Sequence, residues 1–243
     1  MNFDSVVDYD LVKIKEKIYQ VSEYLIDFYV TPFLDLAKQY HINNLVNKLG
    51  IYIHYYCTQE RKVAIIYNDT NIDVTKHNPI SYLQIESYNE LHHNEIMGAV
   101  LNIGLKREVI GDIYCKDGLY LIAINKSHST YIKDNLIYVS RNKVRVLDTN
   151  LIIPETNRIK ETVIVSSLRL DNVVSSVFNL SREKAKEAII NKYVFLNFEN
   201  ELEIDKKVLN NSYLSLRGKG KVFIKESVGK TRKDKYILEI ERF

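Results

Sequence analysis

The chain has 243 residues, which at roughly 150 residues per domain corresponds to one or two domains, or three small ones. Hydrophobic residues make up 46% and charged residues 27%, so the chain can bury a core and is not wholly disordered. Its two cysteines, Cys57 and Cys115, exclude a disulfide scaffold and a four-cysteine zinc site. There is no run of about 18 apolar residues, and the acidic first ten residues do not resemble a signal peptide, so we expect a cytoplasmic protein.

The net charge of +3 hides an uneven distribution. Residues 1–160 hold 18 basic and 19 acidic side chains, whereas residues 161–243 hold 16 and 12. Within the second part, residues 206–235 carry ten basic side chains and two acidic ones, a net charge of +8. Such a density predicts a surface that binds a polyanion. A solvated face of ordinary lysines is the alternative, and charge alone does not decide between them.

Residues 1–78 are predicted to form an α/β region. An apolar stripe at helical spacing predicts one long helix that ends before Pro32, and residues 33–40 suggest a second, shorter one. The stripe consists of Leu11, Ile14, Ile18, Val21, Leu25 and Phe28. We expect it to pack within its own domain; a groove for a partner helix is the alternative. Residues 51–56 and 62–67 read as strands.

The polar residues 68–78 end at Pro79, which indicates a boundary, and residues 79–153 form the predicted middle domain. The expected strands are 80–86, 112–115, 119–124 and 144–147, and the expected helices are 90–103 and 131–138. Gly104 can end the first helix, and Asp117-Gly118 is a hairpin signal between two of the strands.

Residues 154–161 read as a linker, and residues 162–243 as a third domain. This domain is expected to contain helices over 169–178 and 182–190, the second capped by Ser181. Strands are expected at 193–197, 213–216, 221–225 and 236–240. Helices and strands mixed in this order predict an α+β fold class.

Several motifs that would carry chemistry are incomplete. Gly229-Lys230-Thr231 lacks the first glycine of a phosphate loop, and Gly218-Lys219-Gly220 lacks the third glycine of a dinucleotide fingerprint. His92 and His93 are adjacent, so on a helix they would diverge by about 100° and not share a metal; a helix start is the better interpretation. We therefore predict no catalytic residue, no metal and no cofactor.

Arg169-Leu170-Asp171 resembles the tripeptide that carries the catalytic aspartate of pseudouridine synthases. Only 72 residues follow Asp171, too few for that catalytic domain, so we interpret Asp171 as a residue near a helix start.

The segment from Leu168 onward resembles the S4-type RNA-binding domain, an αL-like module. The matching residues are Arg169-Leu170-Asp171, Leu180-Ser181-Arg182, Ala185, Ile189, Val194, Asn197 and Ser215-Leu216-Arg217-Gly218-Lys219-Gly220. Two turn glycines of the module are replaced, by Asn191-Lys192 and by Asn211-Ser212. Because asparagine tolerates positive φ, we expect both turns to be kept.

The rest of the chain is similar to the YlmH family. The similarity is carried by Thr31-Pro32-Phe33-Leu34, Gln59-Glu60-Arg61-Lys62, His93-Asn94-Glu95-Ile96-Met97-Gly98, Gly104-Leu105-Lys106-Arg107-Glu108 and Ile110-Gly111-Asp112-Ile113. The resemblance implies a middle domain with an RNA-recognition-like fold, although the aromatic RNP1 pattern is missing. It also implies a non-enzymatic protein that binds rRNA and tRNA on the large ribosomal subunit during quality control of stalled nascent chains, with a nascent-chain tailing factor as partner.

Ser181 and nine basic residues of the third domain are the expected RNA contacts, through phosphate and A-form shape. They are Arg169, Ser181, Arg182, Lys186, Arg217, Lys219, Lys221, Lys230, Arg232 and Lys233, with Lys106 and Arg107 as a second contact. Arg182 and Lys186 share a helix face, and Arg217, Lys219 and Lys221 would alternate along an extended segment. We expect a monomer that does not bind membranes. The alternatives are an RNA-modifying enzyme and a cell-division-linked factor that dock through this domain.

Overall fold

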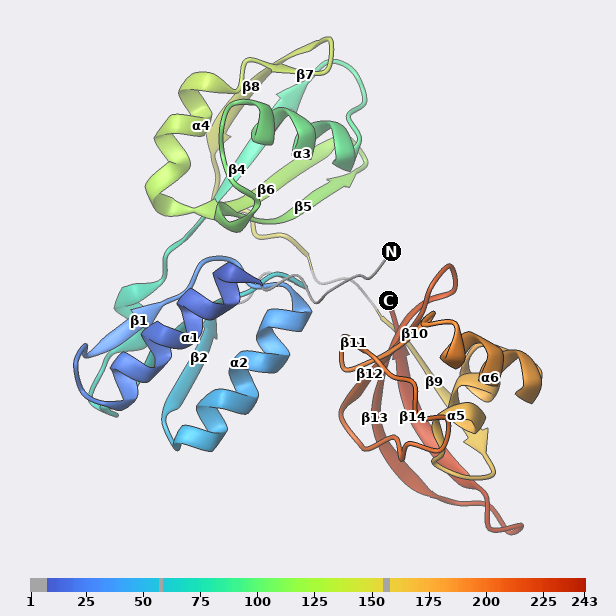
Figure 1. Ribbon diagram of the computed structural model, residues 1–243. Helices are drawn as coiled ribbons and strands as arrows, with labels where there is room; N and C mark the ends of the chain where they lie inside the picture. Colours follow the sequence, from blue (N-terminus) through green and yellow to red (C-terminus); the bar gives the residue numbers. More distant parts are fainter. Residues whose placement is uncertain (1–7, 57–58, 155–157) are drawn as a thin grey trace. The chain divides into compact units, whose positions relative to one another are not determined.

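The computed structural model describes residues 8–56, 59–154 and 158–243, and the chain divides into two compact units, Met1–Thr156 and Asn157–Phe243 (Figure 1). Helices and strands alternate in both units, which confirms the α+β class. The division of the first unit at residue 78 stays a prediction.

The first unit begins with two helices that cover one face of a three-stranded antiparallel sheet of order β1-β3-β2. The elements are α1 (Tyr9–Ser22), β1 (Phe28–Val30), α2 (Leu36–Leu49), β2 (Tyr52–Tyr56), β3 (Val63–Tyr67) and the 3-10 helix η1 (Val74–His77). Ile14, Ile18 and Val21 of α1 are buried with Ile42 and Val46 of α2. The packing of the stripe within its own domain is thereby confirmed up to Val21.

The predicted length of the first helix was wrong. Helix α1 ends at Ser22, and Tyr24 has a φ of 56°, a left-handed conformation that a helix cannot contain. Phe28 lies in β1, where it is paired with Tyr67 of β3. The second helix is longer than expected, because Asp35 caps its start and Gly50, with a φ of 67°, ends it.

The middle of the chain forms a five-stranded antiparallel sheet of order β5-β6-β4-β8-β7, with α3 and α4 on one face (Figure 1). The elements are β4 (Ile80–Ser87), α3 (His93–Asn102), η2 (Arg107–Val109), β5 (Ile110–Lys116), β6 (Leu119–Asn125), η3 (Lys126–His128), α4 (Ser129–Asn135), β7 (Tyr138–Val139) and β8 (Asn142–Asp148). Without the short β7, this is the β-α-β-β-α-β order of ferredoxin-like folds, to which RNA-recognition domains belong. Helix α4 ends three residues earlier than expected, because Tyr138 pairs with Lys143 as part of β7.

The two sheets of the first unit are joined by an apolar cluster that contains Phe33 and residues of both. Val63 and Ile65 of β3 lie in one cluster with Leu121 and Ala123 of β6, all nearly free of solvent exposure. The N–H of Phe33 donates to the carbonyl of Glu108 at 2.9 Å. The face of the middle sheet opposite α3 and α4 is therefore covered at β6.

The second unit is a six-stranded antiparallel sheet of order β11-β10-β12-β13-β14-β9, packed on α5 and α6 (Figure 1). The elements are β9 (Ile159–Val165), α5 (Leu170–Val177), α6 (Arg182–Ile190), β10 (Val194–Leu196), β11 (Glu199–Asn200), β12 (Ser212–Leu216), β13 (Gly220–Lys230) and β14 (Tyr236–Arg242). Both turns are kept. At the first, Lys192 and not Asn191 adopts the left-handed conformation, with a φ of 60°; at the second, Asn211 does so, with a φ of 58°.

Strand β9 begins inside the segment that the sequence predicted to be a linker. Ile159, Lys160 and Glu161 pair with β14, and the guanidinium of Arg242 donates to the Glu161 carboxylate. Lys160 is exposed on this edge strand, where charged side chains are common.

Candidate nucleic-acid interface

A buried carboxylate organises two of the expected contact residues. Asp171 lies in the first turn of α5, which confirms its predicted position near a helix start. Its side chain is 1% exposed. Arg169 Nε is 3.2 Å from Asp171 Oδ1, and Arg182 Nε of α6 is 3.8 Å from Asp171 Oδ2. One carboxylate thus brings together arginines from the starts of two successive helices.

Both arginines keep part of their guanidinium group in solvent, with side chains that are 45% and 55% exposed. The hydrogen bond that Arg169 donates to the Asp171 carboxylate raises the pKa of Arg169 above its ordinary value. Asp205 adds a weaker contact to Arg169 at 3.7 Å. Because a guanidinium has five donors, each arginine can contact Asp171 and still present donors to a phosphate.

Helix α6 presents a further basic residue on the solvent side. Ser181 accepts a hydrogen bond from the N–H of Lys184 at 3.2 Å, which confirms its role as the helix cap. Ala185 and Ile189 are buried, whereas Arg182 and Lys186 are exposed, as the spacing predicted.

The expected alternation of Arg217, Lys219 and Lys221 was wrong. Arg217 to Lys219 form the turn between β12 and β13, because Gly218 and Gly220 have φ of 77° and 94°. Lys221 precedes the buried Val222, so it projects from the sheet face opposite α6, where its ammonium lies 4.2 Å from the Phe243 ring centroid. The structure therefore separates Lys221 from the other two.

The β12–β13 turn contacts Tyr193, which follows the end of α6. The N–H of Arg217 donates to the carbonyl of Tyr193 at 2.9 Å, and the Arg217 guanidinium lies 5.8 Å from the Tyr193 ring centroid. Arg217 and Lys219 thus lie in a turn beside the end of α6, the helix that carries the exposed Arg182 and Lys186.

The remaining predicted contacts lie at the other end of β13. Lys230 forms an ion pair with Asp234 at 2.8 Å, and Arg232 and Lys233 are exposed in the turn between β13 and β14. The eleven residues of β13 separate this turn from Arg217 and Lys219, a distance of roughly 35 Å at about 3.4 Å per residue. The ten expected contacts therefore do not form one continuous patch.

Lys106 and Arg107 have different environments. Lys106 is exposed, whereas the Arg107 guanidinium donates to the carbonyls of Ile110 and Gly111 at 2.5 and 3.2 Å. Burial and the neighbouring Arg61 lower the pKa of Arg107 to about 10. Arg107 thus holds the start of β5, and its expected contact with RNA stays a prediction.

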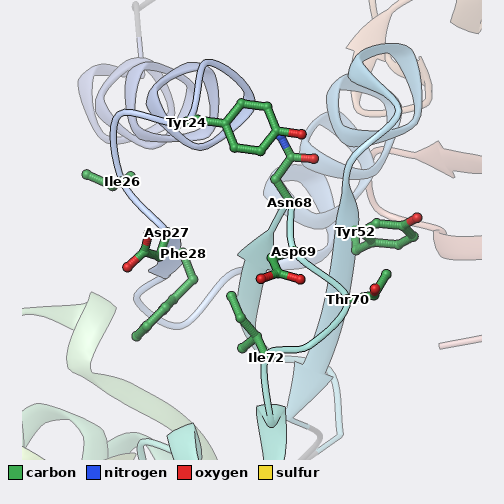
Figure 2. Close-up of a pocket in the computed structure, with 9 residues that line it drawn as sticks. All are labelled: Tyr24, Ile26, Asp27, Phe28, Tyr52, Asn68, Asp69, Thr70 and Ile72. Atoms are coloured by element: carbon green, nitrogen blue, oxygen red, sulfur yellow. The ribbon is translucent and has the colours of Figure 1, made fainter.

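A cavity of about 700 Å³ lies in the first unit between α1, β2 and the loop after β3. Figure 2 shows Tyr24, Tyr52, Asp27 and Asp69 among the residues that line it. Its lining has two carboxylates and no lysine or arginine, so its charge opposes the binding of RNA phosphate.

The histidine pair starts a helix, as predicted: the N–H of His92 donates to the Glu95 carboxylate at 2.9 Å, at the beginning of α3.

Within residues 8–56, 59–154 and 158–243, no group of three or more His, Cys, Asp or Glu side chains could hold a metal ion. Over the same residues, no helix is long and apolar enough to cross a membrane. Cys57 lies outside the described residues, and Cys115 is a half-buried free thiol whose pKa is raised by burial.

Residues 69–152 match a protein-family model described as "Putative RNA-binding domain in YlmH". Over 227 residues the chain is 26% identical to the ribosome-associated protein quality control protein P2 of Bacillus subtilis (strain 168), covering 88% of this chain and 86% of that protein. The two similarities together support a YlmH-type RNA-binding protein. The structure of the cell division protein ylmH from Streptococcus pneumoniae is also similar, with a TM-score of 0.52 and 20% identity, covering 61% of this chain and 94% of that one. At this identity, the similarity to the pneumococcal YlmH structure is evidence for the fold alone.

Local sequence signals do not reveal the residues that position the expected contacts. The pattern around Asp171 indicates only a helix start, and no motif singles out Tyr193 or Asp205. Which side chain of α6 meets Asp171 depends on how the two helices pack, so no local sequence signal predicts the contact with Arg182.

Proposed function

We propose that this YlmH-type chain is a non-enzymatic RNA-binding protein whose second unit is an S4-type domain. The observation that carries the proposal is the convergence of Arg169 and Arg182 on the buried Asp171. A buried carboxylate is costly unless it is paired, and here the two partners are arginines whose other donors face solvent. Such an arrangement orients two guanidinium groups before RNA arrives, which lowers the entropy lost on binding.

Phosphate recognition by this unit would use one side of α6 and the adjacent turn. Arg182 and Lys186 are exposed on α6, and Arg217 and Lys219 lie beside its end. These side chains offer charge and bidentate donors but no aromatic face for base readout, so they suit backbone and A-form shape recognition. The hairpin residues Lys230, Arg232 and Lys233 would form a separate and weaker contact, because Lys230 is already paired with Asp234.

The name of the Bacillus subtilis relative supports a finer proposal. That protein is a ribosome-associated quality control protein, and 88% of this chain aligns with it. We propose that this chain likewise acts in the cytoplasm on the large ribosomal subunit, where it engages rRNA and tRNA during rescue of stalled nascent chains together with a nascent-chain tailing factor. The protein would act as a monomer.

Co-sedimentation with purified large ribosomal subunits tests this proposal. The variant Arg182→Glu with Arg217→Glu should lose binding, whereas Lys13→Glu with Lys48→Glu should retain it. The second variant changes the net charge equally, at exposed lysines of α1 and α2. Equal loss in both variants would reduce the effect to net charge and contradict the proposed site.

The non-enzymatic part of the proposal has its own test. Mass spectrometry of rRNA incubated with the protein, with and without a methyl donor, should show no new methylation or uridine isomerisation. Modified rRNA that depends on the protein would support an RNA-modifying enzyme instead.

A further inference from the structure

The middle sheet is closed to RNA at the place where RNA-recognition domains bind bases. Such domains stack bases on aromatic side chains of the two central strands, on the face opposite the helices. Here the central strands are β4 and β6, and the face of β6 carries Leu121 and Ala123, which are buried with Phe33. A base cannot stack there.

Strand β8, which lies between β4 and the short edge strand β7, leaves the same face of the sheet open. Val144 and Val146 point into the core below α3 and α4, so the alternating Lys143 and Arg145 project from the opposite face. Both side chains are exposed, and neither forms an ion pair with a residue that the structure describes. Arg145 lies opposite Glu86 of β4, the one carboxylate of this surface.

An aromatic ring stands beside these two cations. Tyr88 follows β4 directly and is 106% exposed, so its ring packs on nothing in its own unit. The backbone of Tyr88 is nevertheless held in place by contacts of the residues before and after it. Ser87 pairs with Val144, and the Asn89 side-chain amide donates to Asn142 Oδ1 at 2.8 Å.

Together these residues enclose a concave surface. A cavity of about 550 Å³ is lined by Glu86, Ser87, Tyr88, Lys143, Val144 and Arg145. An aromatic face next to two unpaired cations is the arrangement that binds single-stranded nucleic acid, with the base on the ring and the phosphates on the cations. It lies within residues 69–152, the segment that matches the YlmH RNA-binding-domain model.

We propose that this surface, made of Tyr88, Lys143 and Arg145, binds a single-stranded RNA segment. One base stacks on Tyr88, and the flanking phosphates contact Lys143 and Arg145. The proposal rests on the proposed RNA-binding function and adds a second site, on the first unit, with a different chemistry from the arginine-rich side of α6. It places the contact toward the edge of the middle sheet, because the central strands are covered.

The test uses the full-length protein, a short single-stranded RNA of mixed sequence and purified large ribosomal subunits. Tyr88→Ala should weaken binding roughly tenfold, whereas Tyr88→Phe, which keeps the ring, should bind as the wild type does. Lys143→Gln with Arg145→Gln should make the salt dependence shallower by about one unit. The controls are Tyr24→Ala, an exposed tyrosine of the cavity in Figure 2, and Lys116→Gln, an exposed lysine at the far end of β5. Both should bind as the wild type does.

Photocrosslinking to RNA that contains 4-thiouridine gives a readout that needs no variant. The proposal predicts crosslinked peptides that contain Tyr88. Wild-type affinity in Tyr88→Ala together with crosslinks confined to residues 158–243 would overturn this site and leave the function of the second unit intact. If the wild-type protein binds neither RNA nor subunits, both proposals fail.

Discussion

Phe33 lies directly against Gly111, at the junction between the two sheets of the first unit. A Cβ atom at position 111 would lie 2.6 Å from Phe33 Cε1 and 3.0 Å from the Cβ of Ala123. Only glycine allows this contact, since real Cβ atoms do not approach other heavy atoms within 3.0 Å. The N-terminal sheet and the middle sheet therefore depend on each other for packing.

Gly111→Ala should destabilise the protein by about 1–3 kcal/mol, because the Phe33 ring must move within a packed cluster. Urea unfolding followed by circular dichroism measures the effect. The control is Gly98→Ala on α3, where a Cβ would meet nothing within 4 Å and alanine is the better helix former. If the two variants are equally stable, the close contact at Gly111 does not exist in solution.

Asp171→Asn should weaken RNA binding without touching any RNA-facing side chain. The change removes the charge that holds Arg169 and Arg182, and it should also cost about 1–3 kcal/mol of stability. Asp205→Asn is the matched control, since Asp205 is exposed and contacts Arg169 at 3.7 Å only, so it should change both quantities little. Isothermal titration calorimetry with large ribosomal subunits measures the affinity, and thermal unfolding measures the stability. Unchanged affinity in Asp171→Asn would show that the arginines need no positioning.

Substitution of the adjacent residues Lys106 and Arg107 should affect the stability of the protein differently. Arg107→Gln should lower the free energy of unfolding by about 1–3 kcal/mol, because the carbonyls at the start of β5 lose a charged donor. Lys106→Gln should leave stability unchanged, because Lys106 is exposed. The midpoints of thermal unfolding of the two variants measure this difference in stability. Equal midpoints would contradict the structural role of Arg107.

The second unit should fold alone only when its first strand is complete. A fragment of residues 158–243 keeps all of β9, the pairing of Glu161 with Arg242 and the packing of Arg158 on Phe243. A fragment of residues 162–243 lacks these contacts and should unfold at a clearly lower temperature. Calorimetry on both fragments tests this. Identical midpoints would mean that residues 158–161 are only a linker.

Much of the fold was predictable where local signals were strong. The Asp117-Gly118 hairpin, the Ser181 cap and the buried positions Ala185 and Ile189 follow from turn chemistry, capping and helical spacing, and each is present. Both residues of the hairpin turn have positive φ, 52° and 77°, as such a turn requires.

The errors occurred where tertiary contacts override local pattern. Phe28 fits the helical stripe by spacing, but its pairing with Tyr67 places it in a strand. Residues 154–161 read as a polar linker, but residues 159–161 begin the edge strand β9. Its partner strand β14 lies more than 70 residues further along the sequence. The pairing of Arg169 and Arg182 with Asp171 depends in the same way on how two helices pack, which spacing alone does not give.

The most direct test of the proposed interface is the salt dependence of binding to large ribosomal subunits. If the wild-type protein neutralises about five phosphates, the logarithm of the association constant should fall with that of salt concentration at a slope near −4. The double variant Arg182→Glu with Arg217→Glu should have an affinity at least a hundredfold lower than the wild type, because each lost contact is worth about 1.5–3 kcal/mol. The slope should also become shallower by roughly two units. An unchanged slope with unchanged affinity would contradict the account and leave these arginines as part of a solvated surface.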